Sequence, residues 1–363
     1  PDEPTVSDRS RAMRSSRPEA DTAKDGGDGG DAPASGDAVE SPVSQPGLGR
    51  GARLALVGTV VALLVVLVGA LVSRSSGSGQ QVAPSTTATA SAASSIDPSL
   101  PPLRLVFAPV IEPAVLRREI QPFGAWLGRR LGQRVEITVP PTYAATGELL
   151  RGGEAEVGLL PPLLFVQTQA TDPRIRPVVL RLYEGSRGSD GYLLVRDDAA
   201  IADAAGLRGH TICLVDETST TGYLLPRIWM RKRDIDPEKD VETILSGDHL
   251  AALRDLAKGR CEAAAVYSGA YLSAQSHGIQ VGPMRVLSLT GYVPQEVVVV
   301  SPSYSDEQLR ALEKVLLEFD AERDVGASRV GAVLGLDGFA KYEPEEFTAI
   351  REAAAAEGLL PTP

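Results

Sequence analysis

Histidine and cysteine are scarce in this chain, with three histidines and two cysteines among 363 residues. His210, His249 and His277 have no acidic or cysteine partner at the spacing of a metal site. We therefore interpret the three histidines as isolated core or surface residues. The sequence predicts neither a metal nor another cofactor.

Patterns for catalysis and nucleotide binding are also lacking. Ser219 has neither the G-x-S-x-G context of a hydrolase nucleophile nor an accompanying base. The run Arg151-Gly152-Gly153 lacks the glycine spacing of a P-loop or a dinucleotide-binding loop, and it indicates a turn. The sequence thus predicts a protein that is not an enzyme.

The chain has no surplus of positive charge. Its formal net charge is −11, and residues 101–363 hold 36 acidic and 28 basic side chains. Nucleic acid would require a concentrated basic face, so we exclude it as a partner. Any anion that the protein binds must be attracted locally, by a pocket.

One long stretch has no charge at all. Leu54 to Val72 is 19 uncharged residues, which as a helix would span roughly the hydrocarbon core of a membrane. We predict a transmembrane helix over residues 53–74. A cleaved signal peptide is the competing interpretation, but the run starts too late and is too long for one. No cysteine lies nearby to carry a lipid, so the helix itself would be the anchor.

The charges that flank the predicted helix indicate its orientation. Arg50 and Arg53 precede it with further basic residues, whereas only Arg74 follows closely. The positive-inside rule then predicts a single-pass cell-membrane protein with a cytoplasmic N-terminus and an extracytoplasmic C-terminal domain. Composition predicts a disordered cytoplasmic segment over 1–52 and a Ser/Thr/Ala-rich linker over 75–100.

From Leu103 onward the chain alternates short apolar runs with amphipathic segments, the pattern of an α/β domain with mainly parallel sheets flanked by helices. Two apolar runs, Gly191–Arg196 and Glu296–Val300, bracket a complete second α/β block and can act as crossovers. We predict two lobes within residues 101–363. Lobe one covers about 101–195 with 293–363, and lobe two covers about 196–292.

Four consecutive hydroxyl residues mark a candidate ligand site. Thr218, Ser219, Thr220 and Thr221 follow a predicted strand and precede Gly222, where a helix begins. The first turn of a helix has unpaired N–H groups and a partial positive charge, so this turn can bind an oxyanion without a lysine. An ordinary helix N-cap is the alternative, although one hydroxyl would suffice for that.

The two cysteines, Cys213 and Cys261, lie at similar depth on two predicted neighbouring strands, outside the cytoplasm in the predicted topology. A disulfide and a pair of buried free thiols both fit this placement.

The run Asp216-Glu217-Thr218-Ser219-Thr220-Thr221-Gly222-Tyr223-Leu224-Leu225-Pro226 resembles the D-P-x-S-T-S-G-Y-x-x-P motif of a known family. That family is the substrate-binding proteins of phosphate/phosphite/phosphonate ABC transporters, which have a type II periplasmic binding protein fold. Supporting matches are Pro122 to Leu127, Tyr143-Ala144-Ala145, Lys258 to Tyr267 and Pro294-Gln295-Glu296. The resemblance covers about residues 103–355.

The resemblance implies roles for individual residues. Ser219, Thr220 and Thr221 would hold the oxyanion with hydroxyls and backbone N–H groups, and Tyr143 would face it from lobe one. The family usually has a hydroxyl-bearing aromatic where Phe165 stands. Tyr267 and Ser268 occupy the position of a pocket group that is often acidic in the family. Asp216 and Glu217 would repel a dianion unless they point away, which favours a monoanion or a ligand with an amine.

The sequence therefore predicts a membrane-anchored, extracytoplasmic solute-binding protein that closes two lobes over a small oxyanion. Phosphonate, phosphite and phosphate are the ligand class, and an ABC permease is the expected partner. Two alternatives stay open. The same lobes could be the ligand-sensing ectodomain of a signalling receptor, with a signalling partner instead of a permease. An enzyme on the same fold is the weaker alternative.

Overall fold

The computed structural model of the protein describes residues 96–361. The predicted cytoplasmic segment, transmembrane helix and most of the linker, at 1–52, 53–74 and 75–95, lie outside the described residues. Within 96–361, no helix combines the length and the apolar character that a membrane span requires.

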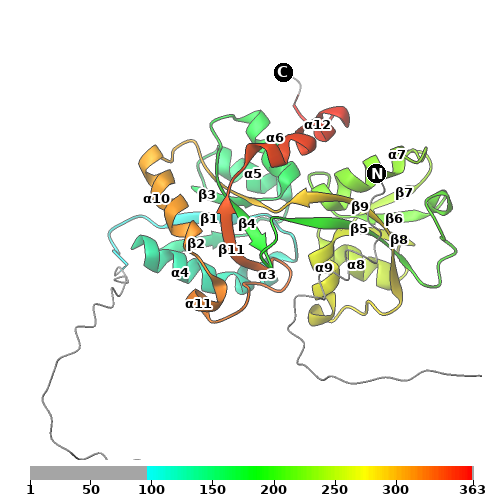
Figure 1. The fold of residues 1–363 in the computed structure, drawn as a ribbon, viewed down its shortest axis with the longest axis horizontal. Helices are drawn as coiled ribbons and strands as arrows, with labels where there is room; N and C mark the ends of the chain where they lie inside the picture. Colours follow the sequence, from blue (N-terminus) through cyan, green and yellow to red (C-terminus); the bar gives the residue numbers. More distant parts are fainter. Residues whose placement is uncertain (1–95, 362–363) are drawn as a thin grey trace, which may run out of the picture. The chain divides into compact units, whose positions relative to one another are not determined.

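Two β-sheets organise residues 96–361 (Figure 1). The first has the strand order β11-β4-β10-β3-β1-β2 and the second has the order β7-β6-β8-β5-β9. Pairing is parallel where helices connect the strands, as between β1, β2 and β3 and between β6, β7 and β8. The strands next to the crossovers pair antiparallel. We call the two halves lobe one and lobe two.

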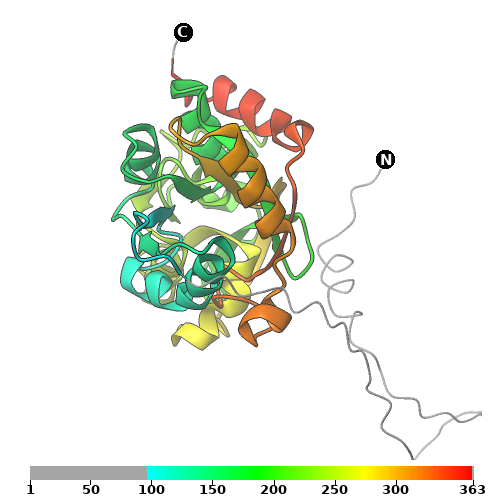
Figure 2. The ribbon, with the colours of Figure 1, turned by 90° about the vertical axis from the view of Figure 1, so that its left-hand side faces the viewer.

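Lobe one contains six strands and most of the helices. Its strands are β1 (Leu103–Phe107), β2 (Val135–Thr138), β3 (Val157–Leu160), β4 (Arg176–Tyr183), β10 (Val297–Val300) and β11 (Leu336–Lys341). Its helices are α3 (Pro113–Glu119), α4 (Gln121–Leu131), α5 (Tyr143–Arg151), α6 (Pro162–Thr171), α10 (Asp306–Leu317), α11 (Ala321–Val325), the 3₁₀ turn η4 (Pro344–Phe347) and α12 (Thr348–Ala356). Figure 2 shows α12, in red, near the top of the view.

Lobe two is the block between the crossovers. Its strands are β5 (Gly188–Arg196), β6 (Thr211–Leu214), β7 (Glu242–Leu245), β8 (Ala263–Tyr267) and β9 (Met284–Pro294). Its helical segments are η1 (Ala205–Leu207), η2 (Thr220–Leu224), α7 (Leu225–Arg231), α8 (His249–Ala257), α9 (Ser268–Ser273) and η3 (Ala274–His277). The segment η2 is a π-helical turn that continues directly into α7.

The crossovers differ by several residues from the predicted lobe boundaries. All of β5 pairs within the second sheet, so the first crossover lies between Tyr183 and Gly188 and not near residue 195. The return crossover lies at Gln295 and Glu296, between β9 and β10. The sequence did not indicate β4, β9 or β11, because each mixes polar residues or glycine with its apolar residues.

A proline separates two helices of lobe one, and the alternation of side chains along β5 shows how the sheet of lobe two is buried. Pro122 occupies the first turn of α4, and α3 ends before it, so the chain has a break between two helices here. In β5, Leu193 and Val195 belong to one hydrophobic cluster and Leu194 to another. Successive side chains of a strand point to opposite faces, so this sheet is covered on both sides.

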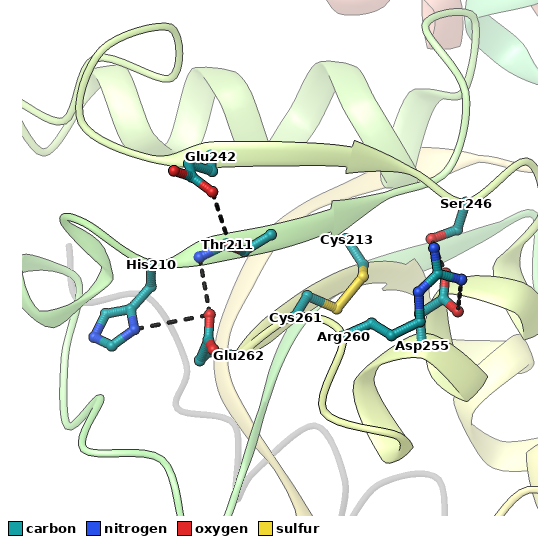
Figure 3. The surroundings of a disulfide bond; sticks show 9 residues. All are labelled: His210, Thr211, Cys213, Glu242, Ser246, Asp255, Arg260, Cys261 and Glu262. Atoms are coloured by element: carbon teal, nitrogen blue, oxygen red, sulfur yellow. Dashed lines mark hydrogen bonds and ion pairs between the residues drawn. A yellow bond between two sulfur atoms is a disulfide. The ribbon is translucent and has the colours of Figure 1, made fainter.

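A disulfide joins Cys213 of β6 to Cys261, just before β8 (Figure 3). The two Cα atoms are 5.8 Å apart, and both side chains are completely buried. Since β6 and β8 are adjacent parallel strands, the bond fixes the start of one strand against the middle of the other. Cys213 is the third residue of β6, and the carboxyl end of this strand leads into the hydroxyl turn.

Candidate functional site

The hydroxyl turn lies at the carboxyl end of β6, where the chain enters η2. Ser219 is the N-cap: its Oγ accepts the backbone N–H of Gly222 at 3.2 Å. Gly222 has no room for a side chain, because a Cβ there would lie 2.4 Å from Val215 Cγ2. The glycine therefore lets the first turn of the helix pack directly against the end of the strand.

A cavity of about 30 Å³ lies beside this turn, between the lobes. On the same measure one water needs roughly 10–15 Å³, so the cavity suits a compact ligand. Lobe two lines it with hydroxyl, imidazole and phenol groups, and lobe one and the crossover complete the wall. The lining residues are Val110, Pro161, Pro162, Ser189, Ser219, Thr220, Thr221, His249, Tyr267, Val293, Pro294, Gln295 and Glu296.

Three helices begin at this cavity. Thr220 starts η2, Pro162 starts α6 and His249 starts α8, and all three residues line the cavity. Helix N-termini carry N–H groups without partners inside the helix and a partial positive charge. Among the described residues that line the cavity, none is lysine or arginine. The attraction for an anion would thus come from backbone dipoles.

The hydroxyls of the turn are oriented by backbone donors. Thr220 Oγ1 accepts the N–H of Leu163, in lobe one, at 2.9 Å, as Ser219 Oγ accepts that of Gly222. Each hydroxyl has one proton of its own, which is then directed to another acceptor. Ser219, Thr220 and Thr221 are 1%, 3% and 6% exposed, so those donors face a largely dry site.

His249 is an uncharged member of the cavity wall. Burial lowers the pKa of its imidazole to about 3, and its ring packs edge-on against Tyr267 at 4.9 Å between centroids. Its Nδ1 has no hydrogen-bond partner among the described residues. An unpaired buried nitrogen is costly, and a bound ligand would supply the missing partner.

Two further buried polar groups near the cavity also lack a hydrogen-bond partner. Within residues 96–361, the Tyr143 hydroxyl and Gln295 Nε2 have no hydrogen-bond partner. Burial, together with the charges of Asp216 and Asp248, raises the pKa of Tyr143 well above its usual value. Its hydroxyl therefore stays protonated and can donate. Gln295 lines the cavity directly, on the return crossover.

Glu296 is the one carboxylate among the described lining residues, and Arg181 neutralises it. Arg181 is fully buried, and its Nε donates to Glu296 Oε2 at 2.6 Å. The same guanidinium donates to Gln295 Oε1 at 2.5 Å and to the carbonyl of Leu334. A buried arginine thus connects the return crossover to the C-terminal part of lobe one.

The structure brings four of the predicted site residues to the cavity wall: Ser219, Thr220, Thr221 and Tyr267. Gly222 packs against Val215 and so supports the turn. Tyr143 lies close enough to Asp216 and Asp248 for their charges to raise its pKa. The Tyr267 hydroxyl donates to the carbonyl of Val333 in lobe one, so this side chain also connects the lobes.

Besides Gly222 and Tyr143, three more predicted site residues are not among those that line the cavity. Thr218 donates to Asp216 Oδ1 from both its N–H and its hydroxyl, at 2.8 and 2.6 Å. Phe165 is buried in lobe one, in edge-on contact with Tyr342 and Phe347. Ser268 is buried at the start of α9. The sequence placed Phe165 by its position in the chain, which does not fix the direction in which its ring points.

Asp216 and Glu217, whose carboxylates were expected to repel a dianion, also lie away from the cavity wall. Asp216 receives the two hydrogen bonds from Thr218, and Glu217 is exposed; neither lines the cavity. Sequence reasoning missed His249, Gln295 and Glu296 as wall residues. His249 directly follows Asp248, the N-cap of a helix after a strand, and that position was a usable signal.

The fold and the site define a class, that of two-lobed α/β binding proteins with a polar cavity between the lobes. The chain belongs to the family of periplasmic substrate-binding proteins of phosphonate ABC transporters, whose sequence pattern it matches over residues 105–347. A curated relative is the phosphate-import protein PhnD of Mycolicibacterium smegmatis, 24% identical over 171 residues. That alignment covers 44% of this chain and spans only about half, 53%, of the relative.

Solved structures share the fold. PhnD1 of Prochlorococcus marinus in complex with methylphosphonate matches with a TM-score of 0.65 and 15% identity, over 71% of this chain and 98% of that protein. The binding-protein component of an ABC phosphonate transporter of Pseudomonas aeruginosa matches with a TM-score of 0.64 and 17% identity, over 71% and 87%. At these identities the likeness establishes the type II periplasmic binding protein fold.

Proposed function

We propose that the protein is a membrane-anchored, extracytoplasmic solute-binding protein that captures a small oxyanion between its lobes for ABC import. The observation that carries this proposal is the cavity at which three helices begin, with the hydroxyls of Ser219, Thr220 and Thr221 on its wall. Family membership supports the transport role.

The chemistry of the wall favours a phosphonate, phosphite or phosphate. Hydroxyl and backbone N–H groups donate to oxygen, and a hydrogen bond to a charged group contributes about 1.5–3 kcal/mol. Three or four such bonds suffice for micromolar affinity, near −8 kcal/mol, after the cost of association. The neutral Arg181–Glu296 pair would leave the field of the helix termini to dominate. The protein binds and releases its ligand without chemical change.

Thermal unfolding of the full chain tests the ligand class. We expect phosphate, phosphite or methylphosphonate to raise the melting temperature, since a ligand at 100 times its dissociation constant stabilises by about 2.7 kcal/mol. Sulfate and methanesulfonate serve as oxyanions of the same tetrahedral shape that carry no ionisable proton at neutral pH. If none of the five raises the melting temperature, the oxyanion proposal is wrong.

A matched pair of threonine variants tests the site. Thr221→Ala should lower the affinity for the best oxyanion by roughly ten- to a hundredfold, the loss of one charge-assisted hydrogen bond. Thr218→Ala removes a hydroxyl from the same run, but one that donates to Asp216 outside the cavity wall, and it should change the affinity by less than about threefold. Equal losses in the two variants would contradict the geometry of the site. Isothermal titration calorimetry gives both values.

A further inference from the structure

Glu119 and His277 form an ion-pair contact between the lobes, away from the hydroxyl turn. Glu119 ends α3 in lobe one, and His277 ends η3 in lobe two. Glu119 Oε1 lies 3.1 Å from His277 Nε2, and the side chains are 20% and 12% exposed. The contact joins residues of different lobes, so a movement of one lobe relative to the other would change it.

The hydrogen bonds of the ring fix the proton on its other nitrogen. His277 Nδ1 lies 3.1 Å from the carbonyl oxygen of Ser273 and 3.1 Å from Ser276 Oγ. The Ser276 hydroxyl donates its proton to the same carbonyl at 2.6 Å, so it accepts at Nδ1. Nδ1 therefore carries a hydrogen. A neutral ring with Nδ1–H presents a lone pair at Nε2.

That lone pair would face the carboxylate of Glu119, which is deprotonated and already accepts another hydrogen bond. Glu119 Oε2 accepts the backbone N–H of Ala332 at 3.1 Å, within lobe one. Two lone pairs repel, so the contact requires one proton between Nε2 and Oε1. Among the described residues, neither side chain forms another ion pair. Tyr267 is also close to Glu119, and burial raises the pKa of its phenol well above the usual value, so it stays neutral.

We propose that Glu119 and His277 are a proton-dependent latch, which takes up one proton as the lobes close over ligand and so makes ligand affinity rise as the pH falls. The inference rests on the proposed function and adds regulation to the same cavity. In an open form the two side chains separate, and the proton between them is released. Because one proton is taken up on closure, linkage limits the effect to about tenfold in affinity per pH unit.

The test measures the affinity of the full chain for methylphosphonate and phosphate by calorimetry, from pH 5.5 to 8.5. His277→Gln keeps a donor toward Glu119 but does not titrate. The ratio of wild-type to H277Q affinity should fall at least about threefold across this range. Protonation of the ligand affects both proteins equally and cancels in the ratio. A ratio that stays constant would overturn the latch.

Glu119→Gln gives the sharper outcome. Its amide can accept from Ala332 with the carbonyl oxygen and donate to the neutral Nε2 with the NH₂ group, so the neutral ring is now preferred. Relative to H277Q, the E119Q affinity should rise with pH, the opposite of the wild-type trend. A wild-type trend in E119Q would contradict the proposal.

His210→Gln is the control. His210 Nδ1 lies 3.8 Å from Glu262 Oε2, and both residues belong to lobe two (Figure 3). Closure leaves this pair intact, so H210Q should keep the wild-type pH dependence. If all variants bind and their affinities change with pH in the same way as that of the wild type, the latch alone is wrong. Absence of binding to either ligand at every pH overturns the latch together with the proposed function.

Discussion

At the scale of single residues, the cavity and its surroundings contain polar groups that burial keeps neutral. His249 has a lowered pKa, and Tyr143 and Tyr267 have raised ones, because in each case burial penalises the charged form. The imidazole and the phenols thus stay uncharged around neutral pH. Their role in binding would be to donate or accept hydrogen bonds while the helix termini supply the field.

The neutral state of His249 predicts a pH dependence of stability. Its folded pKa, about 3, is below the unfolded value of about 6.5, so the unfolded chain binds the proton more tightly. Stability is therefore lost as the pH falls below about 6.5 toward 3. We expect this group to lower the free energy of unfolding by about 2 kcal/mol between pH 7.5 and pH 5.

Urea unfolding at the two pH values measures this effect. His249→Asn should lose about 2 kcal/mol less than the wild type on acidification, because the buried titrating group is absent. His210→Gln, at a partly exposed histidine, should follow the wild type. An H249N variant with the full wild-type loss would show that His249 is not held neutral.

At the scale of elements, strand ends and helix starts position the site. Each of β3, β6 and β7 is followed by a helix that begins at the cavity, namely α6, η2 and α8. In α/β sheets this edge is the usual place for ligands, because the carboxyl ends of parallel strands bring helix N-termini together. The sequence predicted the strand before the hydroxyl run and the turn after it, since an apolar run and consecutive hydroxyl residues are local signals.

The disulfide stabilises the strand pair that carries the hydroxyl turn. The bond closes a loop of 48 residues, for which chain entropy gives about 4 kcal/mol and measured bonds typically give 2–4 kcal/mol. We expect Cys213→Ala with Cys261→Ala to lower the free energy of unfolding by about 2–4 kcal/mol in urea denaturation. A reductant should destabilise the wild type and leave the double variant unchanged. Unlinked peptides in a non-reducing digest of the wild type would contradict the bond.

At the scale of the whole molecule, several contacts hold the lobes against one another at separate places. Leu163 donates to Thr220 beside the cavity, and the backbone N–H of His249 donates to the carbonyl of Val110 at 3.2 Å. Further out, Arg231 of α7 lies 3.1 Å from Glu357, just past α12. The lobes are therefore held together here by polar contacts, which exchange readily with water if the lobes separate.

The transmembrane helix predicted at 53–74 should anchor the whole protein in the membrane in cells. We expect the full chain to remain in the membrane fraction after alkaline carbonate washing, because an uncharged helix of this length inserts into the hydrocarbon core. A protease added outside should digest residues 101–363, in keeping with the positive-inside orientation. Deletion of residues 53–74 is the control, and it should release the protein. A carbonate-soluble full chain would contradict the anchor.

The sequence alone determined the α/β class, the family and the turn that starts at Thr218, because these depend on local periodicity and on a contiguous motif. Only the tertiary structure decided which side chains meet at the cavity: it brought in His249, Gln295 and Glu296, and it directed Thr218 and Phe165 elsewhere. The direction of a side chain and the pairing of distant charges, such as Glu119 with His277, depend on how the two lobes pack. No local pattern of residues encodes that packing.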